Sequence, residues 1–144
     1  QIIFGFEHYA NLLPISRGIY CWDKKRPSGT DYSEFELIWT SFNMRTKFIR
    51  YFWHGMLREG EDNIIHPTQK PIEIIRRLLI DNSKENQIIL DPFLGSGTTA
   101  VACKELGRKF IGIEINPKYC EIAQRRLSQE YLDFKEAESR LEGK

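Results

Sequence analysis

The chain has 144 residues, and its 21 Lys and Arg residues nearly balance its 20 Asp and Glu residues, which gives a net charge of +1. This balance excludes a uniformly basic nucleic-acid-binding protein, and a composition of 41% hydrophobic and 12% aromatic residues excludes wholesale disorder. No apolar run approaches the ~18 residues of a membrane span, so no membrane partner is expected. The three cysteines form no C-x-x-C pair, which favours a reduced, cytoplasmic protein without a metal site, and Cys21 and Cys103 are expected to be buried.

The first part of the chain favours short strands separated by turns. The predicted elements are a strand at 1–6, a short helix at 7–13, a strand at 17–22, a loop at 23–32, strands at 34–41 and 47–55, and a loop at 58–66.

Basic and aromatic side chains alternate near the end of this part. Residues 1–58 hold 8 basic and 5 acidic side chains, whereas the rest of the chain is slightly acidic. Such interleaving is typical of proteins that grip a nucleic-acid backbone and stack on bases. An amphipathic strand with one side in a core explains the same pattern and is the more frequent case. The candidates for nucleic-acid contacts are Arg45, Lys47, Arg50 and Trp53.

From residue 67 helices and strands alternate. The predicted elements are a helix at 71–80 with Pro71 at N1, a strand at 87–90, a glycine loop at 91–99, a helix at 98–106 with Gly107 at C′, a strand at 109–115, and a helix at 117–134 with Asn116 as N-cap and Pro117 at N1. Both strands are continuous apolar runs, as in a parallel sheet covered on both faces. The order predicts an α/β fold with a partly parallel sheet.

The glycine loop predicts a ligand site. Gly95 and Gly97 lie between a strand and a helix, where open α/β sheets bind nucleotide-like ligands. Glu114 ends the next strand and is placed to accept hydrogen bonds from two ribose hydroxyls. The loop also fits a dinucleotide fingerprint, but Asp91 at the strand end disfavours a pyrophosphate and suits a cation, such as the ammonium and sulfonium of S-adenosylmethionine. Alternatively, Asp91 only caps the turn that the glycines make.

The segment 66–71 (HPTQKP) is rigid and polar and directly precedes a helix. Its two prolines restrict the backbone, and Thr68 and Lys70 suit a carboxylate, by hydroxyl and by charge. The helix N-terminus adds amide donors for the same anion. An ordinary helix entry, with His66 as a structural hydrogen-bonding residue, is an equally good interpretation.

Together, segment 66–71, loop 91–99 and Glu114 with Asn116-Pro117 resemble the DNA amino-methyltransferases of the permuted beta group, which methylate adenine N6 or cytosine N4. The resemblance is close over residues 64–130 and implies a Rossmann-like sheet, S-adenosylmethionine as cofactor and double-stranded DNA as partner. It implies cofactor contacts at Thr68, Lys70, Asp91, Phe93, Gly95, Ser96, Gly97, Thr98 and Glu114, with Phe93 packed on the cofactor. It also makes residues 1–144 one partial domain, in which 1–58 form the target side with the DNA-facing basic-aromatic region and 64–134 bind the cofactor.

One family feature is missing. Members carry an Asp/Asn/Ser-Pro-Pro-aromatic motif that binds the target amine, and no two of the six prolines here are adjacent. No catalytic residue is therefore assigned. In the family this motif ends a strand beside the one predicted at 87–90, so the resemblance implies an incomplete sheet. The chain, which has neither a secretory leader nor an initiator Met, is expected to be the C-terminal part of a longer enzyme, its N-terminal part being lost or supplied by another chain, or a second copy taking part.

The sequence thus predicts a site-specific DNA methyltransferase that moves a methyl group from S-adenosylmethionine to an exocyclic amine, adenine N6 being favoured on family frequency. This chain is expected to bind cofactor but to be catalytically incomplete. The alternatives are a methyltransferase acting on RNA or protein, a non-catalytic cofactor-binding remnant or subunit, and a nicotinamide-dependent oxidoreductase.

Overall fold

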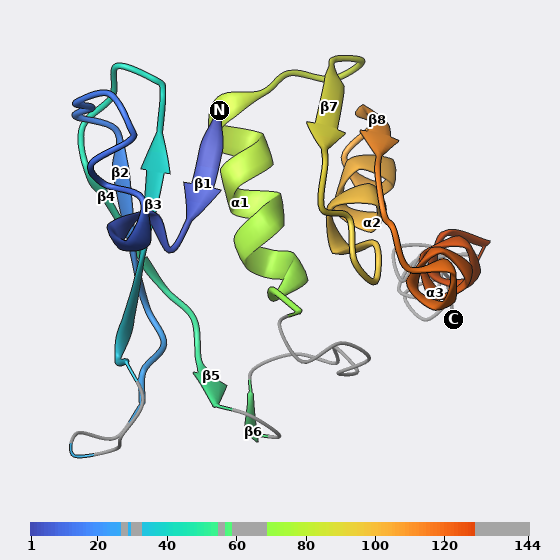
Figure 1. Ribbon diagram of the computed structural model, residues 1–144, viewed down its shortest axis with the longest axis horizontal. Coiled ribbons are helices and arrows are strands. Elements are labelled where there is room, and N and C mark those ends of the chain that lie inside the picture. The colour runs from blue at the N-terminus through green and yellow to red at the C-terminus, as the bar shows by residue number, and fades with distance from the viewer. Residues whose placement is uncertain (27–28, 30–32, 55–56, 59–68, 129–144) are drawn as a thin grey trace, which may run out of the picture. The chain divides into compact units, whose positions relative to one another are not determined.

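The computed structural model describes residues 1–26, 29, 33–54, 57–58 and 69–128 (Figure 1). The chain folds as two compact units, Gln1–Lys84 and Glu85–Lys144. Half of the loop predicted at 23–32, most of the loop predicted at 58–66 and the end of the helix predicted at 117–134 lie outside the described residues. Within the described part, no helix combines the length and the apolar character needed to cross a membrane.

The first unit is built on a four-stranded sheet of order β1-β3-β2-β4. Its strands are β1 (Ile2–Phe4), β2 (Ile19–Asp23), β3 (Phe35–Thr40) and β4 (Lys47–Arg50), and it carries the helix α1 (Ile72–Asn82). β3 pairs antiparallel with β1 and β2, whereas β2 and β4 are parallel. The strands predicted at 1–6, 17–22 and 34–41 are confirmed. The strand predicted at 47–55 instead divides into β4 and β5 (Trp53–His54), which pairs with β6 (Leu57–Arg58).

The helix predicted at 7–13 is wrong. The segment forms one 3-10 turn, η1 (Phe6–His8), that follows Gly5 in the left-handed region with φ 61°. No side-chain hydrogen bond caps this turn, and so short a helix without a cap or a packed face is marginal in water.

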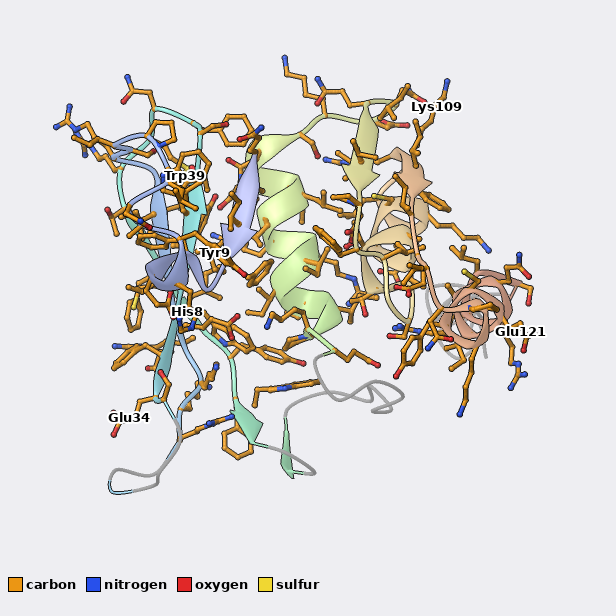
Figure 2. All side chains as sticks on the ribbon, viewed as in Figure 1. His8, Tyr9, Glu34, Trp39, Lys109 and Glu121 are labelled. Atoms are coloured by element: carbon orange, nitrogen blue, oxygen red, sulfur yellow. The ribbon has the colours of Figure 1, made fainter. Side chains whose placement is uncertain are left out.

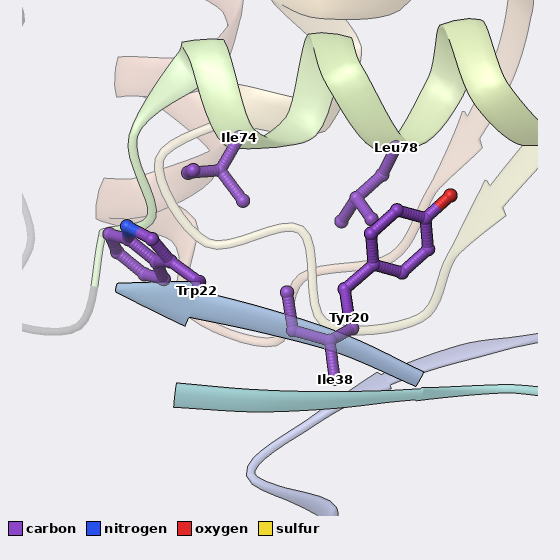
Figure 3. Close-up of a cluster of buried hydrophobic side chains, with 5 residues drawn as sticks. All are labelled: Tyr20, Trp22, Ile38, Ile74 and Leu78. Carbon is purple, nitrogen blue, oxygen red and sulfur yellow. The ribbon is translucent and has the colours of Figure 1, made fainter. Parts of the chain in front are cut away.

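The core of the first unit joins α1 to the sheet. Alternation along β2 sends Tyr20 and Trp22 to one face, where they meet Ile38 of β3 (Figure 3). Ile74 and Leu78 lie one helical turn apart on α1 and complete this cluster. Full burial of each such side chain contributes about 1.5–3 kcal/mol to folding. This packing places α1 in the first unit, whereas the sequence grouped it with the cofactor-binding part.

Pro71 stands at the N-cap of α1 and not at N1 as predicted. Its ψ of 136° is extended, so it lies outside the helix, while its carbonyl accepts a bond from the Ile75 N–H at 3.3 Å. An N-cap residue has this combination of non-helical dihedrals and a helical carbonyl. The helix ends at Ser83, whose N–H and hydroxyl both donate to the carbonyl of Leu79.

The second unit is a strand–helix–strand–helix arrangement. Its elements are β7 (Ile88–Asp91), α2 (Thr98–Glu105), β8 (Lys109–Gly112) and α3 (Pro117–Ser128), and β7 and β8 are parallel. The predicted caps of these helices are confirmed, whereas the strand predicted at 109–115 ends at Gly112. Gly107 has φ 68°, and the N–H groups of Gly107 and Arg108 donate back to Lys104 and Cys103, which is a Schellman motif. Asn116 caps α3 by accepting the Lys118 N–H at 3.0 Å.

The two strands of this unit are more exposed than predicted. Ile88 is 62% and Leu90 61% exposed, and every residue of β8 is exposed. Among the described strands, β7 and β8 pair only with each other. Parallel strands rich in apolar residues are normally covered on both faces. The apolar side chains of β7 and β8 are therefore typical of a larger, covered sheet.

The two cysteines predicted to be buried differ. Cys103 on α2 is fully buried, and burial raises the pKa of its thiol to about 11. Cys21 on β2 is only half-buried, since it points to the sheet face opposite Tyr20 and Trp22.

Candidate functional site

The turn after β7 is fixed by Asp91. Its side-chain Oδ1 accepts the Phe93 N–H at 3.0 Å, and its backbone carbonyl accepts the Ile113 N–H at 2.9 Å. The Leu94 N–H returns a bond to the carbonyl of Ile113 at 2.9 Å. Asp91 therefore does cap the turn, but its Oδ2 makes no hydrogen bond to the described residues. This second oxygen leaves the carboxylate able to attract a cation.

The glycines of the loop are required by its geometry. Gly95 and Gly97 have φ values of 55° and 86°, in the left-handed region. A Cβ on Gly97 would lie 2.7 Å from Cβ of Ala123, which is on the buried side of α3. Glu121, two residues earlier, lies on the exposed side of the same helix (Figure 2). Gly97 thus lets the loop lie directly against α3.

Glu114 connects the loop to the start of α3. Its Oε2 accepts the Gly95 N–H and its Oε1 accepts the Asn116 N–H, both at 2.8 Å. These two bonds fix the orientation of the carboxylate between the loop and the helix. Two oxygens held in this way suit two adjacent hydroxyls of one ligand. The structure thus places the acid that the sequence predicted to bind ribose between the glycine loop and α3.

Arg126 is a residue of this site that the sequence did not predict. One guanidinium nitrogen donates to the Ser96 carbonyl at 2.9 Å, the Ser96 hydroxyl at 3.3 Å and the Thr98 hydroxyl at 3.2 Å. It follows Ala123 by three residues and so lies on the same helix face. The spacing was a signal in the sequence, but only the packing of α3 on the loop shows what the face contacts.

The structure brings seven of the nine predicted cofactor residues into this one region, namely Asp91, Phe93, Gly95, Ser96, Gly97, Thr98 and Glu114. They differ in exposure. Phe93 is 88% exposed, which fits a ring that packs on a ligand, whereas Ser96 is 4% exposed and directs its hydroxyl to Arg126. Ser96 and Thr98 therefore stabilise the loop through the hydrogen bonds that they accept from Arg126.

The other two predicted cofactor residues are placed differently. Thr68 lies outside the described residues, as does His66. Lys70 belongs to the first unit, where its Nζ lies 2.8 Å from Glu36, a carboxylate that also holds Lys24 at 3.0 Å. Burial would raise the pKa of Glu36, but the two lysines outweigh it and lower that pKa. In this arrangement the Lys70 charge is compensated within the protein.

Two of the basic residues predicted to contact DNA face carboxylates. Lys47 lies 2.9 Å from Asp81, and Arg50 lies 3.9 Å from Asp23. Burial would raise the pKa of Asp81, but hydrogen bonds from Lys47 and Tyr20 and the nearby cationic charges lower it. Because side chains alternate along β4, Lys47 and Arg50 lie on opposite faces of the sheet. The pattern is therefore partly that of an amphipathic strand.

The remaining two candidates also differ. Trp53 packs against the core cluster of the first unit, and its carbonyl accepts a hydrogen bond from Arg26. Arg45 is exposed and precedes β4, where it lines a surface cavity. Of the three basic candidates, Arg45 is the one whose charge no described carboxylate offsets.

A parallel strand pair, a glycine loop and an acid two residues after the second strand are typical of proteins that bind a nucleotide-like ligand. Comparison with known proteins gives the family. Residues 11–125 match the family model described as DNA methylase, the N6/N4 methyltransferase family, and the chain belongs to that family.

Individual relatives agree. Type II methyltransferase M2.LlaDCHI of Lactococcus lactis subsp. cremoris is 42% identical over 111 residues, which are 75% of this chain and 40% of the relative. Type II methyltransferase M2.DpnII of Streptococcus pneumoniae is 52% identical over 86 residues, 58% of this chain and 32% of the relative. The chain thus spans less than half the length of these curated relatives.

A solved structure supports the fold. The crystal structure of the M1.HpyAVI–SAM complex matches with a TM-score of 0.57 and 27% identity, over 77% of this chain and 60% of that chain. The predicted α/β methyltransferase fold is confirmed by this likeness, and the predicted cofactor agrees with the ligand of that complex.

Proposed function

We propose that this chain forms the cofactor-binding part of a DNA amino-methyltransferase that uses S-adenosylmethionine. The observation that carries the proposal is the Glu114 carboxylate, which accepts the Gly95 and Asn116 N–H groups and so joins the glycine loop to the start of α3. Family membership supplies the reaction class.

Each loop residue has a role in this proposal. Glu114 accepts hydrogen bonds from the two ribose hydroxyls, and the exposed Phe93 ring packs on the ligand. Asp91 keeps its Oδ1 on the turn and attracts the cationic end of the ligand with its charge. Gly95 and Gly97 let the backbone approach closely. Bound S-adenosylmethionine supplies an electrophilic methyl group on its sulfonium sulfur.

The substrate that we propose is an exocyclic amine of double-stranded DNA, with adenine N6 preferred to cytosine N4. That amine is buried in base pairing, so the base must leave the helix before transfer. Positioning of the amine in line with the methyl group then accounts for most of the catalysis. The residues that hold the amine are supplied from outside this chain, by the rest of a longer polypeptide, a separate chain or a second copy, because no Pro-Pro motif occurs among the 144 residues.

Calorimetric titration of the 144-residue chain with S-adenosylmethionine tests the cofactor role, with Asp91→Asn and Asp91→Ala as variants. Asp91→Asn keeps an oxygen for the Phe93 N–H but removes the charge. We expect about a tenfold loss of affinity in both variants. An unchanged affinity in Asp91→Asn would mean that Asp91 only caps the turn. No binding to the folded wild-type chain would contradict the proposal for this chain alone.

The sequence also favours a second candidate, a non-catalytic cofactor-binding subunit or remnant, because the catalytic motif is missing. Methyl transfer from radiolabelled cofactor separates the two. The enzyme proposal expects transfer to duplex DNA once the family's N-terminal part is added in trans, and none from the chain alone. Binding without transfer in either case supports the second candidate. Transfer to RNA or protein in place of DNA would change the substrate class.

A further inference from the structure

Arg17 and Arg45 have uncompensated charges in the first unit. Both are exposed, and neither guanidinium makes an ion pair or hydrogen bond with the residues that the structure describes. Lys24, Lys47 and Lys70, by contrast, each lie within 3.0 Å of a carboxylate. An arginine pair left without an anion is available for one from outside.

The two arginines line one cavity of about 670 Å³ on the first unit. Ser16, Asn43 and Thr46 add polar groups to its wall, and no Asp or Glu belongs to the lining. Guanidinium groups are planar donors that match phosphate oxygens in pairs. The Asn43 amide is a further donor type that proteins use on phosphates, whereas the Ser16 and Thr46 hydroxyls already donate to the carbonyls of Thr40 and Arg17.

This cavity forms where the segment before β2 closely approaches the segment after β3. Gly18 is buried, and a Cβ there would lie 2.3 Å from the carbonyl oxygen of Phe42, so only glycine lets the segment after β3 pass. The Thr46 hydroxyl then donates to the carbonyl of Arg17 at 3.4 Å. The Gly18 N–H donates to the Ser16 hydroxyl at 3.0 Å. These contacts fix the backbone next to both arginines in the absence of a ligand.

We propose that the Arg17–Arg45 cavity binds a phosphate group of the DNA backbone. The proposal rests on the proposed function for the identity of the polyanion, and it adds Arg17 to the DNA contacts while moving the main contact away from Lys47 and Arg50. The chemistry recognised is a phosphate oxyanion, which a DNA backbone or free phosphate can supply.

Fluorescence anisotropy with a labelled duplex tests it on the full chain, over a series of salt concentrations. Arg17→Ala and Arg45→Ala should each weaken binding about tenfold, and each should reduce the slope of log affinity against log salt by about 1. The double variant should lose less than the product of the two effects, because both side chains hold one phosphate. Arg125→Ala, an exposed arginine of α3, is the matched control and should change neither quantity. Unchanged affinity in the two single variants, or an equal loss in the control, overturns the site and leaves the proposed function standing.

A chain that binds no duplex would contradict the proposed DNA partner, and a second measurement then decides the site. Pyrophosphate is titrated into ¹⁵N-labelled protein while the Gly18 and Thr46 amide signals are followed. Shifts that saturate in wild type and disappear in the double Arg17→Ala, Arg45→Ala variant support an anion site for free phosphates. No saturable shift in wild type overturns it.

Discussion

The Arg126 guanidinium donates to the Ser96 carbonyl at 2.9 Å, which links α3 to a loop 30 residues earlier in the chain. The N–H of the same peptide unit belongs to Gly97 and donates to the carbonyl of Leu94 at 3.0 Å. Both the carbonyl and the N–H of this peptide unit are therefore hydrogen-bonded. Because the peptide lies in the middle of the glycine loop, α3 sets the conformation that a ligand meets.

Replacing Arg126 tests this link. Arg126→Ala should weaken S-adenosylmethionine binding about tenfold and speed hydrogen exchange at the Gly97 amide, because the Ser96 carbonyl loses a charged donor. Arg126→Lys should recover part of the affinity, since an ammonium group supplies the charge without the planar donor set. Arg125→Ala changes the same charge on the exposed side of α3 and should have no effect on either quantity. Equal exchange rates in Arg126→Ala and Arg125→Ala would contradict the link.

Gly97→Ala should be unusually costly. Its φ of 86° strains any L residue, and the new methyl group would meet Ala123, so we expect a loss of about 2–4 kcal/mol in the free energy of unfolding. Gly29→Ala is the matched control, since Gly29 has the same φ but no atom within 4 Å of its would-be Cβ. It should lose only about 1 kcal/mol. Urea unfolding measures both.

A second substitution separates the cost of the strained φ at Gly97 from the cost of the contact with Ala123. Ala123→Gly removes the nearest atom, so the double variant Gly97→Ala, Ala123→Gly should recover part of the loss despite a cost of about 1 kcal/mol for glycine in a helix. Purely additive losses in the double variant would show that strain at φ, and not contact with α3, dominates.

Glu114→Gln tests how the acid is used. The amide keeps one oxygen and replaces the other with a donor, so either the Gly95 or the Asn116 N–H loses its acceptor and the negative charge is lost. Adenosine, which has the two ribose hydroxyls but no cation, should bind at least about tenfold more weakly. Asp91→Asn should leave adenosine binding unchanged while weakening S-adenosylmethionine. The opposite pattern in calorimetry would reverse the proposed roles of the two acids.

Glu36→Gln should alter the pH dependence of stability. The folded pKa of Glu36 lies below its ordinary value of 4.5, so the unfolded state binds protons more readily and the stabilisation is present above pH 4.5. It is lost as the pH falls through the lower, folded pKa. At pH 7 the variant should be about 3 kcal/mol less stable, because two lysines lose their shared partner, and the difference from wild type should shrink in acid.

Urea unfolding between pH 3 and 7 measures this difference. Glu73→Gln is the matched control, because Glu73 is exposed and its one ion pair with the described residues is to Arg76, along the surface of α1. It should shift stability by less than about 1 kcal/mol. A constant difference between Glu36→Gln and wild type over the pH range would contradict the role of the ion pairs.

Local signals in the sequence were enough for the ends of elements. Asn116 and Gly107 each act on residues within one turn, so their side-chain chemistry alone predicts the cap and the helix end. The spacing of Gly95 and Glu114 was similarly informative, since neighbouring parallel strands end at one edge of the sheet. Pro71 was misplaced by one position because proline suits both sides of the boundary.

Interactions between distant elements were not predictable in this way. The sequence predicted Lys70 as a ligand-binding cation but not its ion pair with Glu36, which forms because α1 packs on the sheet that carries β3. Arg126 looked like one of several helix charges until the packing of Ala123 on Gly97 brought it to the loop. Both contacts depend on which faces of two elements meet, and a hydrophobic pattern shows that a face is buried without naming its neighbour.

Because Cys103 is buried, the rate at which its thiol is alkylated measures local opening of the chain. Only a thiolate reacts with an alkylating reagent, and this thiol is enclosed and hard to ionise, so it is labelled when the second unit opens. Cys21 lies in the first unit and is half-buried, and its pKa is also raised by burial. Timed alkylation followed by mass spectrometry would therefore record the opening of the second unit at Cys103, with the half-buried Cys21 and Cys120 as comparison thiols in the same sample.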